Sequence, residues 1–200
     1  HRYDTADYHH IDPIFGSEDE FRALCAEAEA QGIGIMLDGV FSHTGADSRY
    51  FDKCARYADV GAYEADDSPY KSWYRFAGDR KHYDSWWGFP SLPNVNELEP
   101  SYADFIAGEN GVLSHWAGAG AKNWRLDVAD ELPDEFIRIL RRRMKQNDPE
   151  SVLLGEVWED CSNKYGTEGR RGYVNGDELD STMNYPFTEA AISFLTARTD

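Results

Sequence analysis

Two short apolar segments decide the fold: WRLDV at residues 124–128 and VLLGEV at residues 152–157. Each is rich in aliphatic residues and follows a segment that reads as helix, which is typical of a buried strand in a parallel sheet. Each carries a carboxylate near its end, Asp127 in the first and Glu156 in the second. In α/β barrels the functional side chains lie at the C-terminal ends of the strands. The two segments therefore predict a parallel α/β fold with a site at that edge.

Asp127 and Glu156 follow successive strands, so we expect their side chains to lie near each other. A pair of carboxylates, one acting as acid and the other as nucleophile, is the usual equipment for cleaving a glycosidic bond. The alternative is structural, with each carboxylate only capping its strand or binding a neighbouring loop.

The rest of the chain repeats a strand–helix pattern. The predicted elements are helix 17–31, strand 33–38, helix 102–117 with a break near its two glycines, strand 124–128, helix 133–145, strand 152–157, strand 179–183 and a helix from residue 186. Ser17 and Glu20 form a capping box for the first helix. Since a complete (β/α)8 barrel needs roughly 250 residues, we expect a partial TIM barrel comprising about strands three to six.

A long insertion separates the first predicted strand from the second. We therefore divide the chain into a barrel segment at residues 1–43, an inserted loop subdomain at 44–100 and a second barrel segment at 101–200. The insertion is rich in aromatic residues, among them Trp86 and Trp87. These rings either stack on sugar rings over the barrel mouth or pack a small core of the insertion itself, and Trp86 and Trp87 are the best candidates for the first role.

Composition limits the function classes. The net charge of −17 makes a phosphate-binding or nucleic-acid surface unexpected, and the chain has no apolar run of about 18 residues that would span a membrane. The three cysteines are scattered without metal-ligand spacing, which favours free thiols and a cytoplasmic location. The sequence starts at His1 without an apolar leader, and we expect it to be part of a longer protein, so secretion stays open.

Four short motifs occur in order along the chain: DGVFSH at 38–43, LPNVN at 92–96, RLD at 125–127 and GEVW at 155–158. Together they resemble the conserved motifs of the α-amylase family of glycoside hydrolases. The resemblance implies a (β/α)8 barrel and retaining cleavage of α-glucosidic bonds.

Further segments resemble the neopullulanase and cyclomaltodextrinase branch of that family: HRYDTADY at 1–8, IDPIFG at 11–16 and MNYPF at 183–187. This branch implies α-1,4 or α-1,6 cleavage in starch-derived oligosaccharides, cyclomaltodextrins or pullulan. It also implies a homodimer as one form of the full-length protein. An α-glucanotransferase, or an inert relative that binds sugar or another protein, is the alternative.

The resemblance also assigns roles to residues. Asp127 is the nucleophile, Glu156 is the acid and base with a raised pKa, and Arg125 keeps Asp127 ionised. Asp38 and Asn96 are structural residues near the site, with Asp38 holding Arg125. The remaining substrate-binding candidates are Tyr3, His43, Trp86, Glu131 and Trp158, and for Glu131 a helix-capping role is the alternative.

Two departures from the family pattern concern the cofactor and the third acid. The resemblance implies no required cofactor, although many members bind Ca²⁺ through an asparagine at the position of Ser42. Serine is a poorer oxygen ligand than an amide, so the residue disfavours a calcium site. The family's histidine–aspartate motif of the seventh strand, which supplies a third catalytic carboxylate, does not occur in the sequence.

Overall fold

The computed structural model describes residues 2–166 and 169–198. Its helices and strands are α1 (Glu18–Ala30), β1 (Met36–Gly39), α2 (Pro100–Ala107), α3 (Val112–Gly118), β2 (Asn123–Leu126), α4 (Asp134–Asn147), β3 (Leu153–Gly155), β4 (Tyr165–Gly166), β5 (Gly169–Arg170), β6 (Ser181–Thr182) and α5 (Tyr185–Leu195). Short 3-10 helices occur at η1 (Pro13–Phe15), η2 (Lys71–Trp73), η3 (Trp86–Gly88) and η4 (Ala129–Glu131). Within the described residues, no helix has the length and apolar character needed to cross a membrane.

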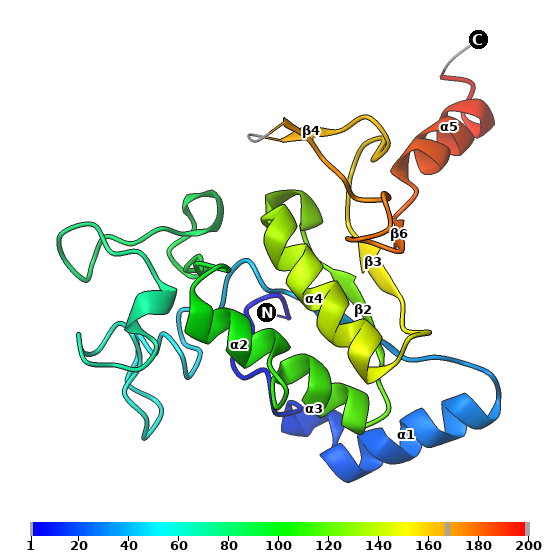
Figure 1. Ribbon diagram of the computed structural model, residues 1–200. Helices are drawn as coiled ribbons and strands as arrows, with labels where there is room; N and C mark the ends of the chain where they lie inside the picture. The colour runs from blue at the N-terminus through cyan, green and yellow to red at the C-terminus, as the bar shows by residue number, and fades with distance from the viewer. Residues whose placement is uncertain (1, 167–168, 199–200) are drawn as a thin grey trace.

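A parallel sheet with the order β1-β2-β3-β6 forms the centre of the fold. Helices α2, α3 and α4 pack against one another and lie in front of the sheet in Figure 1. The fully buried side chains between the layers include Phe41, Tyr102, Leu126, Phe136 and Leu140. The expected partial α/β barrel fold with a parallel sheet is confirmed.

The helix boundaries follow the local sequence signals. Ser17 accepts a hydrogen bond from the backbone of Glu20 and the Glu20 side chain bonds back to Ser17, so the predicted capping box is present. Gly108 and Gly111 separate α2 from α3, as the sequence predicts. At α4, Pro133 is the N-cap residue and no side chain caps the helix.

The first strand is the clearest correction to the sequence analysis. We expected a buried strand at residues 33–38, but β1 spans Met36–Gly39 and is largely exposed. Ile33 is 57% exposed and Met36 is 39% exposed. β1 is an edge strand in the described sheet, with only β2 as its neighbour, so one side of it has no packing partner.

The crossover between β3 and β6 also differs from a simple strand–helix repeat. The described part of residues 156–180 forms the β4–β5 hairpin instead of a helix (Figure 1). This segment is rich in glycine and charged residues and has no apolar helical periodicity, which explains the absence of a helix there.

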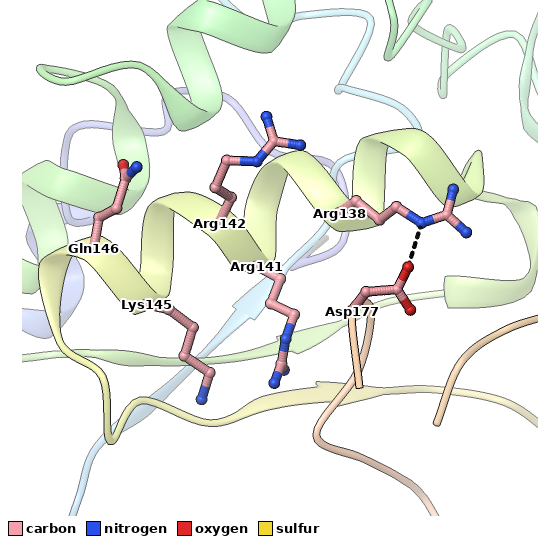
Figure 2. A pocket seen from close by; sticks show the side chains of 6 residues that line it. All are labelled: Arg138, Arg141, Arg142, Lys145, Gln146 and Asp177. Carbon is pink, nitrogen blue, oxygen red and sulfur yellow. Dashed lines mark hydrogen bonds and ion pairs between the residues drawn. The ribbon is translucent and has the colours of Figure 1, made fainter. Parts of the chain in front are cut away.

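Ion pairs join α4 to the segment before β6. Figure 2 shows Arg138, Arg141, Arg142 and Lys145 along α4, with Asp177 beside Arg138. Arg138 pairs with Asp177 at 2.9 Å and with Glu178 at 2.6 Å, and Arg141 pairs with Asp180 at 2.6 Å. Most of these basic side chains of α4 are thus paired with carboxylates of the same chain.

Arg138→Met is expected to destabilise the fold, because it leaves the Glu178 carboxylate buried without its cation. Glu178 is 0% exposed but Arg138 is 35% exposed, so the loss lies below the cost of breaking a fully buried pair, at about 1–2 kcal/mol. Urea unfolding of the full-length protein would measure the change. Arg142→Met is the matched control, since Arg142 is exposed and should matter by less than about 0.5 kcal/mol. Equal effects of the two variants would contradict the prediction.

Candidate active site

Four charged side chains meet at the C-terminal edge of the sheet. Arg125 on β2 is in register with Asp38 on β1, and Asp127 and Glu156 follow β2 and β3 directly. Arg125 Nη1 donates to Asp38 Oδ1 at 2.7 Å and to Asp127 Oδ1 at 2.9 Å. Its Nη2 lies 2.9 Å from Glu156 Oε2. One guanidinium thus links three carboxylates from three parallel strands.

The Glu156 carboxylate has further hydrogen-bond donors around it. Oε2 also accepts from the Val128 backbone N–H at 2.9 Å. Oε1 accepts from the Trp158 indole at 3.1 Å and from the Tyr185 hydroxyl at 3.2 Å. Val128 adopts a left-handed conformation, with φ 41° and ψ 50°. In this left-handed conformation the Val128 backbone N–H points at the Glu156 carboxylate.

The pKa of Glu156 corrects the sequence analysis. We expected it to be raised, and burial does act in that direction. However, the hydrogen bonds from Val128 and Trp158, together with the charge of Arg125, outweigh burial and lower the pKa below its usual value. Glu156 is therefore ionised at neutral pH in this structure.

Asp127 shows the opposite shift. Burial raises its pKa to about 6, against the hydrogen bond and charge of Arg125, while Asp38 and Glu156 add repulsion between like charges. Its backbone N–H donates to the carbonyl of Gly39 at 3.1 Å, which continues the pairing of β1 with β2. Asp127 is 8% exposed, so it faces a largely enclosed edge of the site.

His43 lies in a buried position beside the N-terminal segment. Its Nε2 is 3.1 Å from the backbone oxygen of Tyr3, and its Nδ1 is 2.9 Å from Ser42 Oγ. Burial lowers the pKa of His43, which favours the neutral imidazole. Tyr3 itself is 40% exposed, and the Asp38 carboxylate is the main cause of its raised pKa. The structure thus brings Tyr3 and His43 to the acidic edge.

Glu131 binds two indoles from the insertion. Trp86 Nε1 donates to Glu131 Oε2 at 2.8 Å, and Trp87 Nε1 donates to Oε1 at 2.9 Å. The alternative of a helix cap is wrong, because α4 has no side-chain cap. The Trp86 ring lies 5.5 Å from His43, and the Trp87 ring lies 6.5 Å from Trp158. Trp86, Glu131 and Trp158 therefore belong to the rim of the same site.

Asn96 stands apart from the charged residues. Its side-chain oxygen accepts from Arg75 at 3.3 Å, and its backbone N–H donates to the carbonyl of Trp73 at 2.7 Å. Among the described residues, no hydrogen bond joins Asn96 to the acidic group. Its contacts lie within the insertion, where Trp73 and other rings such as Tyr50, Phe51 and Tyr74 are buried.

Sequence reasoning missed two groups that contact Glu156, the Val128 backbone N–H and the Tyr185 hydroxyl. The left-handed turn at Val128 has no sequence signal, because β-branched residues rarely adopt it. Tyr185 lies in the MNYPF segment that carries the resemblance to the neopullulanase branch. That resemblance gave no role to Tyr185, and only the parallel pairing of β6 with β3 brings it to the site.

The residues around Ser42 do not fit a calcium site. The Ser42 hydroxyl is buried and is engaged by His43. In the ranges 2–166 and 169–198 no group of three or more His, Cys, Asp or Glu side chains is arranged to hold a metal ion.

A parallel α/β sheet with linked carboxylates at its C-terminal edge defines a barrel-type enzyme site of the kind that cleaves glycosidic bonds. The family model described as "Alpha amylase, catalytic domain" matches residues 1–199. The chain belongs to the α-amylase family.

The chain is similar to several named enzymes. An amylopullulanase of Thermoanaerobacterium saccharolyticum is 37% identical over 98% of this chain and 16% of its own length. Neopullulanase 2 of Thermoactinomyces vulgaris is 36% identical over 98% of this chain and 31% of its own length. The cyclic α-maltosyl-(1→6)-maltose hydrolase of Arthrobacter globiformis has a similar structure, with a TM-score of 0.82, 30% identity, and coverage of 97% of this chain and 41% of that one. The chain thus spans less than a third of the length of these two curated relatives.

Proposed function

We propose that the full-length protein is a retaining glycoside hydrolase that cleaves α-1,4 or α-1,6 glucosidic bonds in starch-derived oligosaccharides, cyclomaltodextrins or pullulan. The observation that carries the proposal is the Arg125 guanidinium, which binds Asp127 and Glu156 at once. An arginine that holds both carboxylates fixes their orientation toward a shared substrate. The names of the relatives support the substrate class.

Asp127 is the proposed nucleophile. Its carboxylate attacks the anomeric carbon as the bond to the leaving oxygen breaks, and Glu156 gives its proton to that oxygen. In the second step Glu156 takes a proton from water, and the resulting hydroxide displaces Asp127 from the sugar. This double displacement predicts a separation of about 5–5.5 Å between the two carboxyl groups.

Glu156 must acquire a proton before it can act as the acid. With donors on both oxygens the ionised form is favoured, so the bound substrate has to replace part of this donor set. The Trp158 and Tyr185 side chains on Oε1 are the ones that substrate can displace, because Trp158 is 51% exposed whereas the Val128 N–H is backbone. Substrate binding would then also raise the pKa of Glu156.

Tyr185→Phe tests this role of the donor set. Removing the hydroxyl removes one hydrogen bond to the ionised form of Glu156, so the pKa of Glu156 rises. The acid then stays protonated to higher pH. Because the pKa of Glu156 lies below that of Asp127 in the free protein, Glu156 sets the acidic limb of the profile of kcat/KM against pH, and this limb moves upward by about half a unit. The control is Tyr165→Phe, since Tyr165 is 71% exposed in the β4–β5 hairpin. A downward shift for Tyr185→Phe would contradict the prediction.

His43 and Tyr3 are proposed to bind the sugar ring on one side of the cleaved bond. The exposed ring of Tyr3 can stack on the sugar face. Both ring nitrogens of His43 have partners in the chain, so a sugar hydroxyl has to replace the Tyr3 carbonyl as the partner of His43 Nε2. Trp158 and Glu131 are proposed to surround the opposite side, where the leaving group and the acceptor bind, with Trp86 between Glu131 and His43. A transglycosylase shares this arrangement and differs only in passing the sugar to another sugar.

Several further properties are proposals on the same basis. The proposed chemistry uses only side chains and needs no cofactor. Residues 44–100 are proposed to act as a subdomain over the site. The barrel is proposed to be completed by further residues of the full-length protein. A third carboxylate would come from those further residues. A homodimer and a cytoplasmic location are also proposed, and the unpaired Cys25, Cys54 and Cys161 agree with a reducing compartment.

Product chromatography on the full-length protein tests the proposal. Wild type and Glu156→Gln are incubated with β-cyclodextrin, pullulan and starch. Sugar released by the wild type alone, with the α-anomer formed first, would support a retaining hydrolase, and the relative rates would define the substrate. Longer oligosaccharides among the products would favour the transglycosylase. No product from a folded protein would leave the inert sugar-binding relative as the better account.

A further inference from the structure

The tip of the insertion is attached to the barrel by one carboxylate. Glu131, at the end of η4, accepts the Trp86 indole on one oxygen and the Trp87 indole on the other. We call Trp86, Trp87 and Glu131 the indole clasp. It connects two segments more than forty residues apart in sequence, the turn after β2 and the tip of the loop.

The backbone at the clasp is arranged for this contact. Consecutive residues of an extended segment point in opposite directions, yet Trp86 and Trp87 both reach Glu131. Trp87 has φ 50° and ψ 26°, a left-handed conformation that L-residues rarely adopt. This conformation allows the two rings to stack, with centroids 5.1 Å apart and planes 16° apart. The contacts of the clasp offset the unfavourable backbone.

The clasp lies over the proposed acid. Trp87, Val128, Glu131, Glu156 and Trp158 line a small pocket, together with Asp130. The pocket has a volume of about 80 Å³, less than one glucose ring requires. A shift of the Trp87 ring, which is 65% exposed, would therefore change how much space is open above Glu156.

We propose that Glu131 is a positioning residue: its carboxylate holds Trp87 over Glu156 and so determines the size of the leaving group or acceptor that can bind there. This proposal rests on the proposed function. In this role the carboxylate acts through the two indole N–H groups that it accepts, and not through a hydrogen bond of its own to the sugar. The aromatic faces, not the carboxylate, then contact the sugar.

The Glu131→Gln variant distinguishes the positioning role of Glu131 from a direct contact between Glu131 and the sugar. An indole N–H only donates, and a side-chain amide offers a single acceptor oxygen. Glu131→Gln therefore keeps the acceptor for one indole and sets an amide NH2 against the other indole N–H, so one of the two hydrogen bonds is lost. A sugar hydroxyl, by contrast, can hydrogen-bond equally well to an amide as to a carboxylate.

The test is a double-mutant cycle of Glu131→Gln with Trp87→Phe in the full-length protein. Phenylalanine keeps an aromatic ring but lacks the N–H, so it breaks the same clasp from the other side. We expect each single variant to raise KM for maltotriose by about 5- to 10-fold with kcat changed less than about twofold. The double variant should resemble a single variant, because both remove one interaction. Effects that multiply would overturn the proposal and indicate a direct sugar contact by Glu131.

Acrylamide quenching of tryptophan fluorescence gives a second readout that needs no activity. Glu131→Gln should increase quenching, since a released indole is more accessible. Glu135→Gln is the control, because it removes the same charge from an exposed site on α4 and should leave quenching and KM unchanged. Unchanged quenching in Glu131→Gln would show that the clasp does not form. If the wild type released no sugar, the proposed function would fail while quenching still decided the clasp.

Discussion

Asp127→Asn is expected to reduce kcat/KM for every α-glucan substrate by at least about 10⁴-fold, as loss of a nucleophile does in other covalent mechanisms. The amide is nearly isosteric and can still accept the hydrogen bond that Arg125 now gives to Asp127 Oδ1. It cannot attack the anomeric carbon as a carboxylate does. The loss should therefore be confined to the chemical step, with binding of the substrate largely retained.

The stability of Asp127→Asn distinguishes this loss from misfolding. Folding raises the pKa of Asp127 to about 6, so the folded state favours the protonated form. Because the pKa of Asp127 is higher in the folded state than in the unfolded state, raising the pH from about 4 through about 6 lowers the stability of the folded state. A neutral amide removes that cost, and the variant should be at least as stable as wild type at pH 7. Thermal unfolding would measure it, and a destabilised variant would contradict the argument.

Rescue by azide provides a stereochemical test of which carboxylate is the nucleophile and which is the acid and base. In Asp127→Gly, azide can enter the space of the lost side chain and attack from the same face, which gives a β-glycosyl azide from an activated α-substrate. In Glu156→Ala, azide attacks the covalent intermediate from the opposite face and gives an α-glycosyl azide. Opposite anomers from the two variants would establish the roles, and the same anomer from both would exclude the double displacement.

The sequence was sufficient to predict the sheet and the location of its acidic edge. The segments at 124–128 and 152–157 are mostly apolar, which predicts buried strands, and the helices before them favour a parallel arrangement. From that arrangement alone Asp127, Arg125 and Glu156 must share one edge. Strand β1 was harder to place, because its burial depends on a neighbour that the described sheet does not contain.

The properties of Glu156 could not be predicted, because its donors come from separate parts of the chain. Trp158 lies two residues away, but Tyr185 comes from beyond β6, and the Val128 N–H depends on a single backbone torsion. A pKa depends on the sum of such contacts against burial. The charge of Asp127 and partial burial, taken without these donors, therefore predict the wrong direction. The contact of Glu131 with two indoles was equally hidden, since a loop places them and no local pattern marks the pair.

Arg125→Lys should have the second largest effect, a loss of about 10²- to 10³-fold in kcat/KM near pH 6. The two Nη atoms of Arg125 bind Asp38, Asp127 and Glu156 together, and a lysine ammonium on a flexible chain cannot match that planar geometry. Two consequences follow. The carboxylates lose their fixed orientation, and the pKa of Asp127 rises further above about 6 because its nearest cation is held less closely.

The pH profile separates these consequences. Because the pKa of Asp127 lies above that of Glu156 in the free protein, Asp127 sets the alkaline limb of kcat/KM, and a higher pKa of Asp127 moves that limb toward higher pH. Raising the pH should therefore restore part of the lost activity, while the orientational part of the loss stays constant. Arg49→Lys is the matched control, because Arg49 also bridges two carboxylates, those of Asp7 at 2.7 Å and Asp59 at 2.6 Å. It should leave the profile unchanged. An unshifted alkaline limb in Arg125→Lys would mean that Arg125 only orients Asp127, and that burial alone decides when the nucleophile is charged.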